Sequence, residues 1–120
     1  MTDTMYRREI MDLYSEKPNF GILKNKTHEI KMKNPGCEDE IIIQLSLDKS
    51  GKIADAKFSG VTCFISTISA SAILENIKGM TLDEVKKLSK KDIDKFLGIN
   101  VIPTRINCEL LPLEALKKIK

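Results

Sequence analysis

The sequence has little of what proteins use to bind nucleic acids or membranes. It contains four phenylalanines, two tyrosines and no tryptophan, and its net charge of +3 comes from scattered lysines. Nucleic-acid binding needs concentrated positive charge or aromatic side chains that stack on bases, and we expect neither here. No apolar run approaches the roughly 20 residues that cross a membrane, and the N-terminus lacks the apolar core of a signal peptide. We therefore expect a cytoplasmic protein without a membrane or nucleic-acid partner.

The sequence also lacks two common catalytic arrangements. Its single histidine, His28, shares a predicted strand face with Ile30 and Met32. This position favours a packed or surface histidine over the base that activates a cysteine nucleophile. No glycine-rich loop that cradles phosphates is present. We expect neither a thiol protease nor a phosphate-binding enzyme.

Apolar and polar residues alternate in the first half of the chain, which predicts strands. The alternation occurs in three runs, at 28–33, 41–48 and 54–58. Turn sequences, NPG and DKSG, separate the runs, so neighbouring strands are expected to pair antiparallel. In the third run we expect Ala54, Ala56 and Phe58 to share one face.

Apolar spacing near 3.6 residues predicts helices before and after the strands. The expected helices are 3–14, 64–78, two short ones with capping patterns at Thr81 and Ser89, and a last one with Pro112 in its first turn. Strands followed by helices indicate an α+β fold, a three-stranded antiparallel sheet with several helices packed on one face. No linker or repeat divides the chain, so we expect a single domain over residues 1–120.

The three cysteines, Cys37, Cys63 and Cys108, have no C-x-x-C spacing. An odd number cannot all pair, and a cytoplasmic chain keeps thiols reduced. Each cysteine lies at the end of a predicted element, where sites are usually built. Cys63 directly precedes a helix, whose positive N-terminal end favours a thiolate. This placement favours a shared site assembled by the fold over three inert core residues.

Asp39 extends this predicted site. In an extended segment, residues two apart project to the same side, so Cys37 and Asp39 are expected to face together. With Cys63 and Cys108, the donors become three thiolates and one carboxylate. This set suits either four-coordinate zinc or a binuclear iron–sulfur cluster.

Five segments in register resemble one known family. They are YSEKPNFG at 14–21, NPGCED at 34–39, GVTCFISTISAS at 60–71, KGMTL at 78–82 and PTRINC at 103–108. The chain resembles the iron–sulfur cluster assembly scaffolds of the NifU N-terminal-domain type, which include Isc-type and Suf-type scaffold proteins. The resemblance covers almost the whole chain from Tyr14 onward.

The resemblance implies a binding protein rather than an enzyme. Such a scaffold accepts sulfur from a cysteine desulfurase, receives iron, assembles a nascent [2Fe–2S] cluster and transfers it to apo iron–sulfur proteins. By position, Cys37, Asp39, Cys63 and Cys108 are the implied ligands, and the cysteines are the implied sulfur acceptors. Carboxylate is a harder partner for iron than thiolate, so Asp39 is expected to ease release of the cluster.

Three residues depart from the family pattern. Glu38 and Thr62 stand where relatives have glycine, although a threonine before a helix is suited to capping it. Asn107 stands where Isc-type members have a histidine, which removes one candidate ligand. Only Pro103 and Arg105 of the Isc-type chaperone-docking segment are kept, so we do not expect dependence on a dedicated chaperone.

Two alternative functions stay open. The same four ligands satisfy tetrahedral zinc, so the protein is alternatively a zinc-bound sulfur acceptor of the Suf type, acting as a sulfurtransferase. Suf-type zinc proteins carry an extra segment between the second and third cysteines, for which the spacing from Cys63 to Cys108 has no room. The departures at Glu38, Thr62 and Asn107 motivate the other alternative, a family member that only folds and docks partners.

Overall fold

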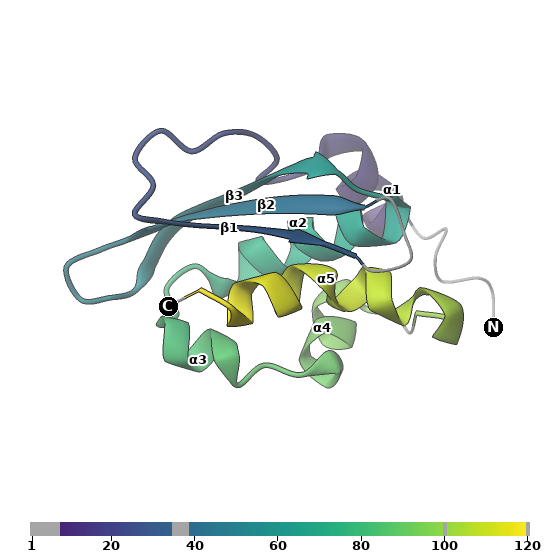
Figure 1. Cartoon of the computed structure of the whole chain (residues 1–120). Coiled ribbons are helices and arrows are strands. Elements are labelled where there is room, and N and C mark those ends of the chain that lie inside the picture. The colour runs from purple at the N-terminus through teal and green to yellow at the C-terminus, as the bar shows by residue number, and fades with distance from the viewer. Residues whose placement is uncertain (1–7, 35–38, 100, 120) are drawn as a thin grey trace.

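The computed structural model describes residues 8–34, 39–99 and 101–119. Its elements, in chain order, are α1 (Arg8–Glu16), β1 (His28–Lys33), β2 (Glu40–Leu47), β3 (Ile53–Val61), α2 (Phe64–Ile77), α3 (Leu82–Lys86), α4 (Lys90–Leu97), η2 (Pro103–Arg105) and α5 (Ile106–Lys117). Figure 1 shows the strands as one layer, with α2 and α5 against one face and α3 and α4 beyond them. The predicted α+β fold, a three-stranded antiparallel sheet with helices on one face, is confirmed.

Residues 3–7, where we predicted the first helix to begin, lie outside the described residues. Within the described ranges, no helix is long and apolar enough to span a membrane.

The sheet has the order β1-β2-β3, and both neighbouring pairs are antiparallel. The alternation predicted for β1 is present, since His28, Ile30 and Met32 are partly buried and the residues between them are exposed. In β2 the side chains of the inner face are fully buried, namely those of Ile41, Ile43 and Leu45. This face forms one side of the hydrophobic core.

The third strand differs from the prediction at its beginning. Ala54 is exposed, whereas Ile53 is buried together with Ala56 and Phe58. The pairing of β2 with β3 is irregular here, because Ser46 pairs with Asp55 and Leu47 pairs with Ile53. One extra residue in β3 therefore turns Ile53 toward the core and Ala54 toward solvent. The prediction that Ala54 shares the buried face was wrong for this reason.

The segment between α1 and β1 covers part of the opposite face of the sheet (Figure 1). The backbone N–H of Leu23 donates to Gln44 Oε1 over 2.7 Å, and that of Gly21 donates to the carbonyl of Phe58 over 2.8 Å. Because of this cover, Gln44 is buried although it points away from the core. Both faces of the central strand are thereby shielded from water.

Helix α2 lies at the centre of the molecule. Every residue from Ile65 to Leu74 is buried, and α1, α4, α5 and β3 all contact this helix. The four apolar residues at helical spacing, Ile65, Ile68, Ala72 and Ile77, are all among the buried ones. The small side chains between them, serine, threonine and alanine, allow neighbouring elements to approach on every side. The serine and alanine content of α2 is explained by this complete burial.

Helix α5 begins earlier than predicted. We expected Pro112 in its first turn, but the helix starts at Ile106 and Pro112 lies inside it. Proline has no N–H, so it cannot donate to the carbonyl of Cys108, four residues before it. That carbonyl accepts a hydrogen bond from Ser66 Oγ over 3.1 Å instead. A contact between two helices replaces the lost intrahelical bond.

A buried carboxyl pair links α4 to α5. Glu109 has no exposed surface, and Lys90 Nζ lies 2.8 Å from Asp94 Oδ2 and 3.8 Å from Glu109 Oε1. Among the described residues, no N–H or O–H group donates to Asp94 Oδ1 or to either carboxyl oxygen of Glu109. Burial first, and then the adjacent Asp94, raise the pKa of Glu109 to about 8, while Lys90 opposes the shift. A protonated Glu109 that donates to Asp94 gives one oxygen of each carboxyl group a partner.

Glu109→Gln should reduce the pH dependence of stability. In the native state Glu109 keeps its proton up to about pH 8, whereas in the unfolded chain it loses it near its ordinary pKa of 4.5. Native protein therefore binds more protons across that window, and the free energy of unfolding falls as pH rises, by at most about 1.4 kcal/mol per pH unit. Glutamine cannot titrate. Urea denaturation at several pH values should show the variant gaining stability relative to wild type as pH rises; a constant difference would contradict the shifted pKa.

Candidate metal centre

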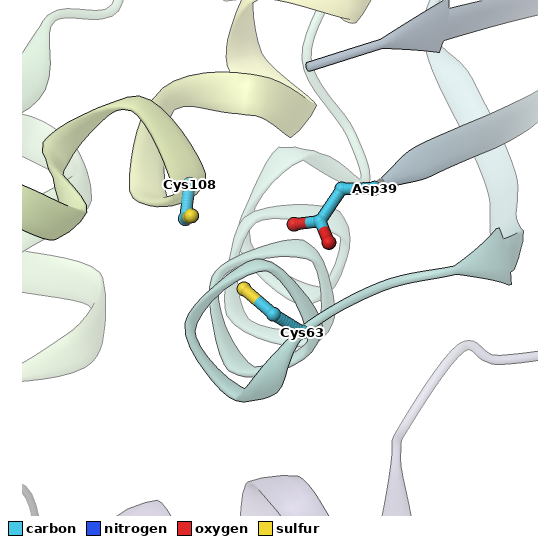
Figure 2. Close-up of side chains that lie close together, drawn as sticks. All are labelled: Asp39, Cys63 and Cys108. Carbon is cyan, nitrogen blue, oxygen red and sulfur yellow. The ribbon is translucent and has the colours of Figure 1, made fainter. Parts of the chain in front are cut away.

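Three of the four predicted ligands meet in the structure. One ligand atom each from Asp39, Cys63 and Cys108 lies within 4.8 Å of the other two. In Figure 2 the carboxylate of Asp39 points between the two sulfurs, which come from the beginnings of α2 and α5. The fourth predicted ligand, Cys37, lies outside the described residues, as does Glu38.

The pairing of β2 with β3 brings Asp39 and Cys63 to the same end of the sheet. Glu40, the residue after Asp39, pairs with Val61, and Ile41 pairs with Gly60. Gly60 has a φ of +111°, and a Cβ there would lie 2.2 Å from the carbonyl oxygen of Glu40. Only glycine fits this close approach of the two strands. The chain leaves β3 beside Asp39 and reaches Cys63 two residues later.

Cys63 caps helix α2. It has extended backbone angles, and its Sγ accepts a hydrogen bond from the N–H of Ser66 over 3.4 Å. The neighbouring Thr62, which we considered as a capping residue, instead pairs its hydroxyl with that of Thr67 over 2.6 Å. The position at the N-terminal end of the helix places a partly exposed sulfur in a positive field.

Cys108 is the more enclosed sulfur. It is 5% exposed and lies in the first turn of α5. Asn34 Nδ2 donates to its Sγ over 3.7 Å, and Arg105 Nη1 lies 4.0 Å from it. Burial raises the pKa of the Cys108 thiol, and nearby Cys63 and Asp39 raise it further, while Arg105 lowers it. A bound cation would stabilise the ionised form of the Cys108 thiol beside these neighbours.

Two cavities lie beside the ligands. One of about 150 Å³ is lined by Cys63, Phe64, Ile65, Ile102 and Arg105, so it gives access to the Cys63 sulfur. The other, of about 220 Å³, includes Asn107 together with Met32 and Asn34. Asn107 thus lines a space between β1 and α5.

Sequence reasoning missed the residues that surround the ligands. Asn34, Ser66 and Arg105 each contact a ligand side chain, but only their places in family motifs marked them. A serine three residues after the helix cap has its N–H directed at the cap side chain, so Ser66 carried a usable signal. Its contact with Asp39, 27 residues away, follows only from the fold.

The fold and these donors define a small α+β protein with a candidate metal centre of two thiols and a carboxylate. The chain belongs to the family described as "NifU-like N terminal domain", whose model matches residues 5–119. The predicted resemblance to iron–sulfur cluster assembly scaffolds is thereby confirmed.

Relatives within this family are named either as a sulfurtransferase or as scaffold proteins. The chain is 35% identical to the zinc-dependent sulfurtransferase SufU of Bacillus subtilis, with 97% of this chain and 89% of that protein covered. It is 34% identical to the iron–sulfur cluster assembly scaffold protein IscU of Thermotoga maritima, with 95% and 91% covered. A crystal structure from Fervidobacterium islandicum AW-1, described as a scaffold for iron–sulfur cluster assembly in the SUF system, superimposes with a TM-score of 0.76 at 28% identity, covering 98% and 97%.

Chain length does not distinguish the relative named a sulfurtransferase from the relative named a scaffold. The alignments with the Bacillus and Thermotoga proteins run over 133 and 130 positions, more than the 120 residues of this chain. Both relatives therefore contain residues without a counterpart here. The argument against the zinc-bound function from the spacing of Cys63 and Cys108 stays a prediction, because the relative named a sulfurtransferase and the relative named a scaffold both carry additional residues.

Cys63→Ser should separate folding from metal binding. Serine is a preferred helix cap, so metal-free protein is expected to keep its circular dichroism spectrum and its Tm. A hydroxyl is a poor partner for zinc or iron, so Zn²⁺ affinity should fall by more than the roughly 10–100-fold that follows loss of an outer contact. Competition with a coloured chelator under reducing conditions measures this. Unchanged affinity in the folded variant would remove Cys63 from the ligand set.

Proposed function

We propose that the protein is a scaffold on which a nascent [2Fe–2S] cluster is assembled with sulfur from a cysteine desulfurase and then transferred to apo iron–sulfur proteins. The observation that carries the proposal is the meeting of Asp39, Cys63 and Cys108 within 4.8 Å at the ends of three elements. Cys37, which lies between β1 and β2 in the sequence, completes the proposed set of four ligands.

The mixed donor set suits a protein that must release what it binds. Thiolates are soft ligands that hold iron strongly, whereas a carboxylate oxygen is harder and more readily displaced from a cluster. A protein that keeps its cluster for electron transfer is better served by four sulfurs. Asp39 is buried beside the two thiols and occupies the place that a further sulfur would take.

Sulfur delivery requires an accessible thiolate. A thiolate of this chain attacks the outer sulfur of the desulfurase persulfide, forms a new S–S bond, and leaves the desulfurase cysteine as a thiolate. Of the two described cysteines, Cys63 faces a cavity while Cys108 is buried. We therefore infer that Cys63 accepts sulfur more readily than Cys108.

The proposal also includes the domain organisation, the compartment and the partners of the protein. It takes residues 1–120 as a single domain that works in the cytoplasm as a binding protein rather than an enzyme. It requires a cysteine desulfurase and apo-protein acceptors as partners and no dedicated chaperone.

The second candidate is a zinc-bound sulfur acceptor that acts as a sulfurtransferase. The observation in its favour is the 35% identity to a protein named as a zinc-dependent sulfurtransferase. Three thiolates and one carboxylate also make a tetrahedral zinc site. In that case zinc would be resident, and sulfur would leave on a thiol rather than within a cluster.

Reconstitution without oxygen distinguishes the two candidates. Protein incubated with iron, cysteine and a cysteine desulfurase should develop the visible absorption of a [2Fe–2S] cluster and then convert an apo [2Fe–2S] protein to its holo form. A folded protein that stays colourless but accelerates the desulfurase when loaded with zinc would establish the second candidate. A protein that does neither and binds no metal would leave only a docking role.

Asp39→Cys should slow cluster transfer. A fourth sulfur replaces the harder oxygen, so the reconstituted cluster is expected to last longer and reach the acceptor more slowly. Asp83→Cys is a matched control, because it adds a thiol on the exposed surface of α3. The measurement is the rate at which acceptor absorption or circular dichroism appears. Equal transfer rates for wild type and Asp39→Cys would show that the carboxylate does not govern release.

A further inference from the structure

Ser66 touches all three described ligands. It has no exposed surface and lies in the first turn of α2. Its Oγ lies 2.9 Å from Asp39 Oδ2 and 3.1 Å from the carbonyl oxygen of Cys108. Its backbone N–H donates to Cys63 Sγ over 3.4 Å. Ser66 is not one of the proposed ligands, but its hydrogen bonds connect the three ligands to one another.

The hydroxyl of Ser66 has one proton for two oxygen acceptors, and its own oxygen accepts from Cys63 Sγ over 3.5 Å. An ionised carboxylate is the stronger acceptor, so the proton favours Asp39 over the neutral carbonyl of Cys108. That carbonyl competes because Pro112 supplies no N–H to it. The Ser66 hydroxyl therefore restrains the rotation of the Asp39 carboxylate, while the carbonyl of Cys108 shares the same proton as the weaker acceptor.

We propose that Ser66 is a positioning residue of this site, whose hydroxyl holds Asp39 in the orientation that binds the metal or cluster. The proposal rests on the proposed function, since it takes Asp39, Cys63 and Cys108 as ligands. Ser66 acts through Asp39 and not by binding the ion. Hydrogen bonds to ligating carboxylates orient them, and loss of such an outer contact typically lowers metal affinity by about 10–100-fold.

A close structural match provides the control. Ser69, one turn further along α2, is also fully buried and donates from Oγ to the carbonyl of Glu109 over 2.5 Å. Ser69→Ala therefore removes the same group from the same helix and the same kind of bond to α5. It differs from Ser66→Ala in leaving the contacts to the Asp39 carboxylate and to the Cys63 sulfur untouched.

The test is titration of the metal-free, reduced protein with Co²⁺, whose visible absorption reports thiolate ligation and coordination geometry. Ser66→Ala should bind Co²⁺ about 10–100-fold more weakly than wild type and with altered absorption bands, whereas Ser69→Ala should match wild type. In an Asp39→Ala background, adding Ser66→Ala should cause no further loss, because the residue acts through that carboxylate. Equal losses in the two serine variants, or a second loss in the Asp39→Ala background, would overturn the proposal.

Pro112→Ala provides a second test that does not remove the hydroxyl. The new N–H can donate to the carbonyl of Cys108, which leaves the Ser66 proton to Asp39 alone. Co²⁺ binding at least as tight as in wild type supports the proposal, and weaker binding overturns it. Wild-type protein that binds no Co²⁺ would overturn the proposed metal site as well, so failure of the site is distinguishable from failure of the role of Ser66.

Discussion

The burial of α2 from Ile65 to Leu74 is the constraint on which the rest of the structure depends. The helix contacts the sheet, α1, α4 and α5, so its small side chains leave it no room to shift or rotate. Its N-terminus is consequently fixed at the end of the sheet where β2 begins and β3 ends. Cys63, which caps the helix, and Ser66 in its first turn are therefore held in fixed positions. A site built on such an element has its geometry set by the core rather than by loops.

The same core gathers groups that repel one another when ionised. Asp39 and Cys108 are each 5% exposed, and the raised pKa of Cys108 reflects burial together with the neighbouring acids. Asn34 and Arg105 approach the sulfur of Cys108 at 3.7 and 4.0 Å, and the N–H of Ser66 donates to the sulfur of Cys63 over 3.4 Å. A bound cation would displace the proton of the Cys108 thiol. The fold thus holds the three donors together before any cation binds.

Local sequence patterns predicted much of this arrangement. They failed where contacts between distant segments determine the structure. Alternation and capping patterns identified the strands and helices, and element ends identified Asp39, Cys63 and Cys108 as neighbours. The exposure of Ala54 depends on an irregular pairing of β3 with β2, which no single strand reveals. Pro112 inside α5 is tolerated because Ser66, far earlier in the chain, satisfies the carbonyl of Cys108. The buried Glu109 is likewise intelligible only beside Asp94 and Lys90.

Under the proposed function, the difference between the two described sulfurs gives cluster transfer a direction. Cys108 is enclosed and anchored in α5, whereas Cys63 borders a cavity lined partly by the exposed Ile102. An incoming acceptor thiol can reach only a ligand that faces solvent, so exchange begins on the Cys63 side. Asp39, whose oxygen binds iron less firmly, then gives way before Cys108 does. Among the three described ligands, the enclosed sulfur is thus the last contact to break, which keeps the cluster attached until the acceptor holds it.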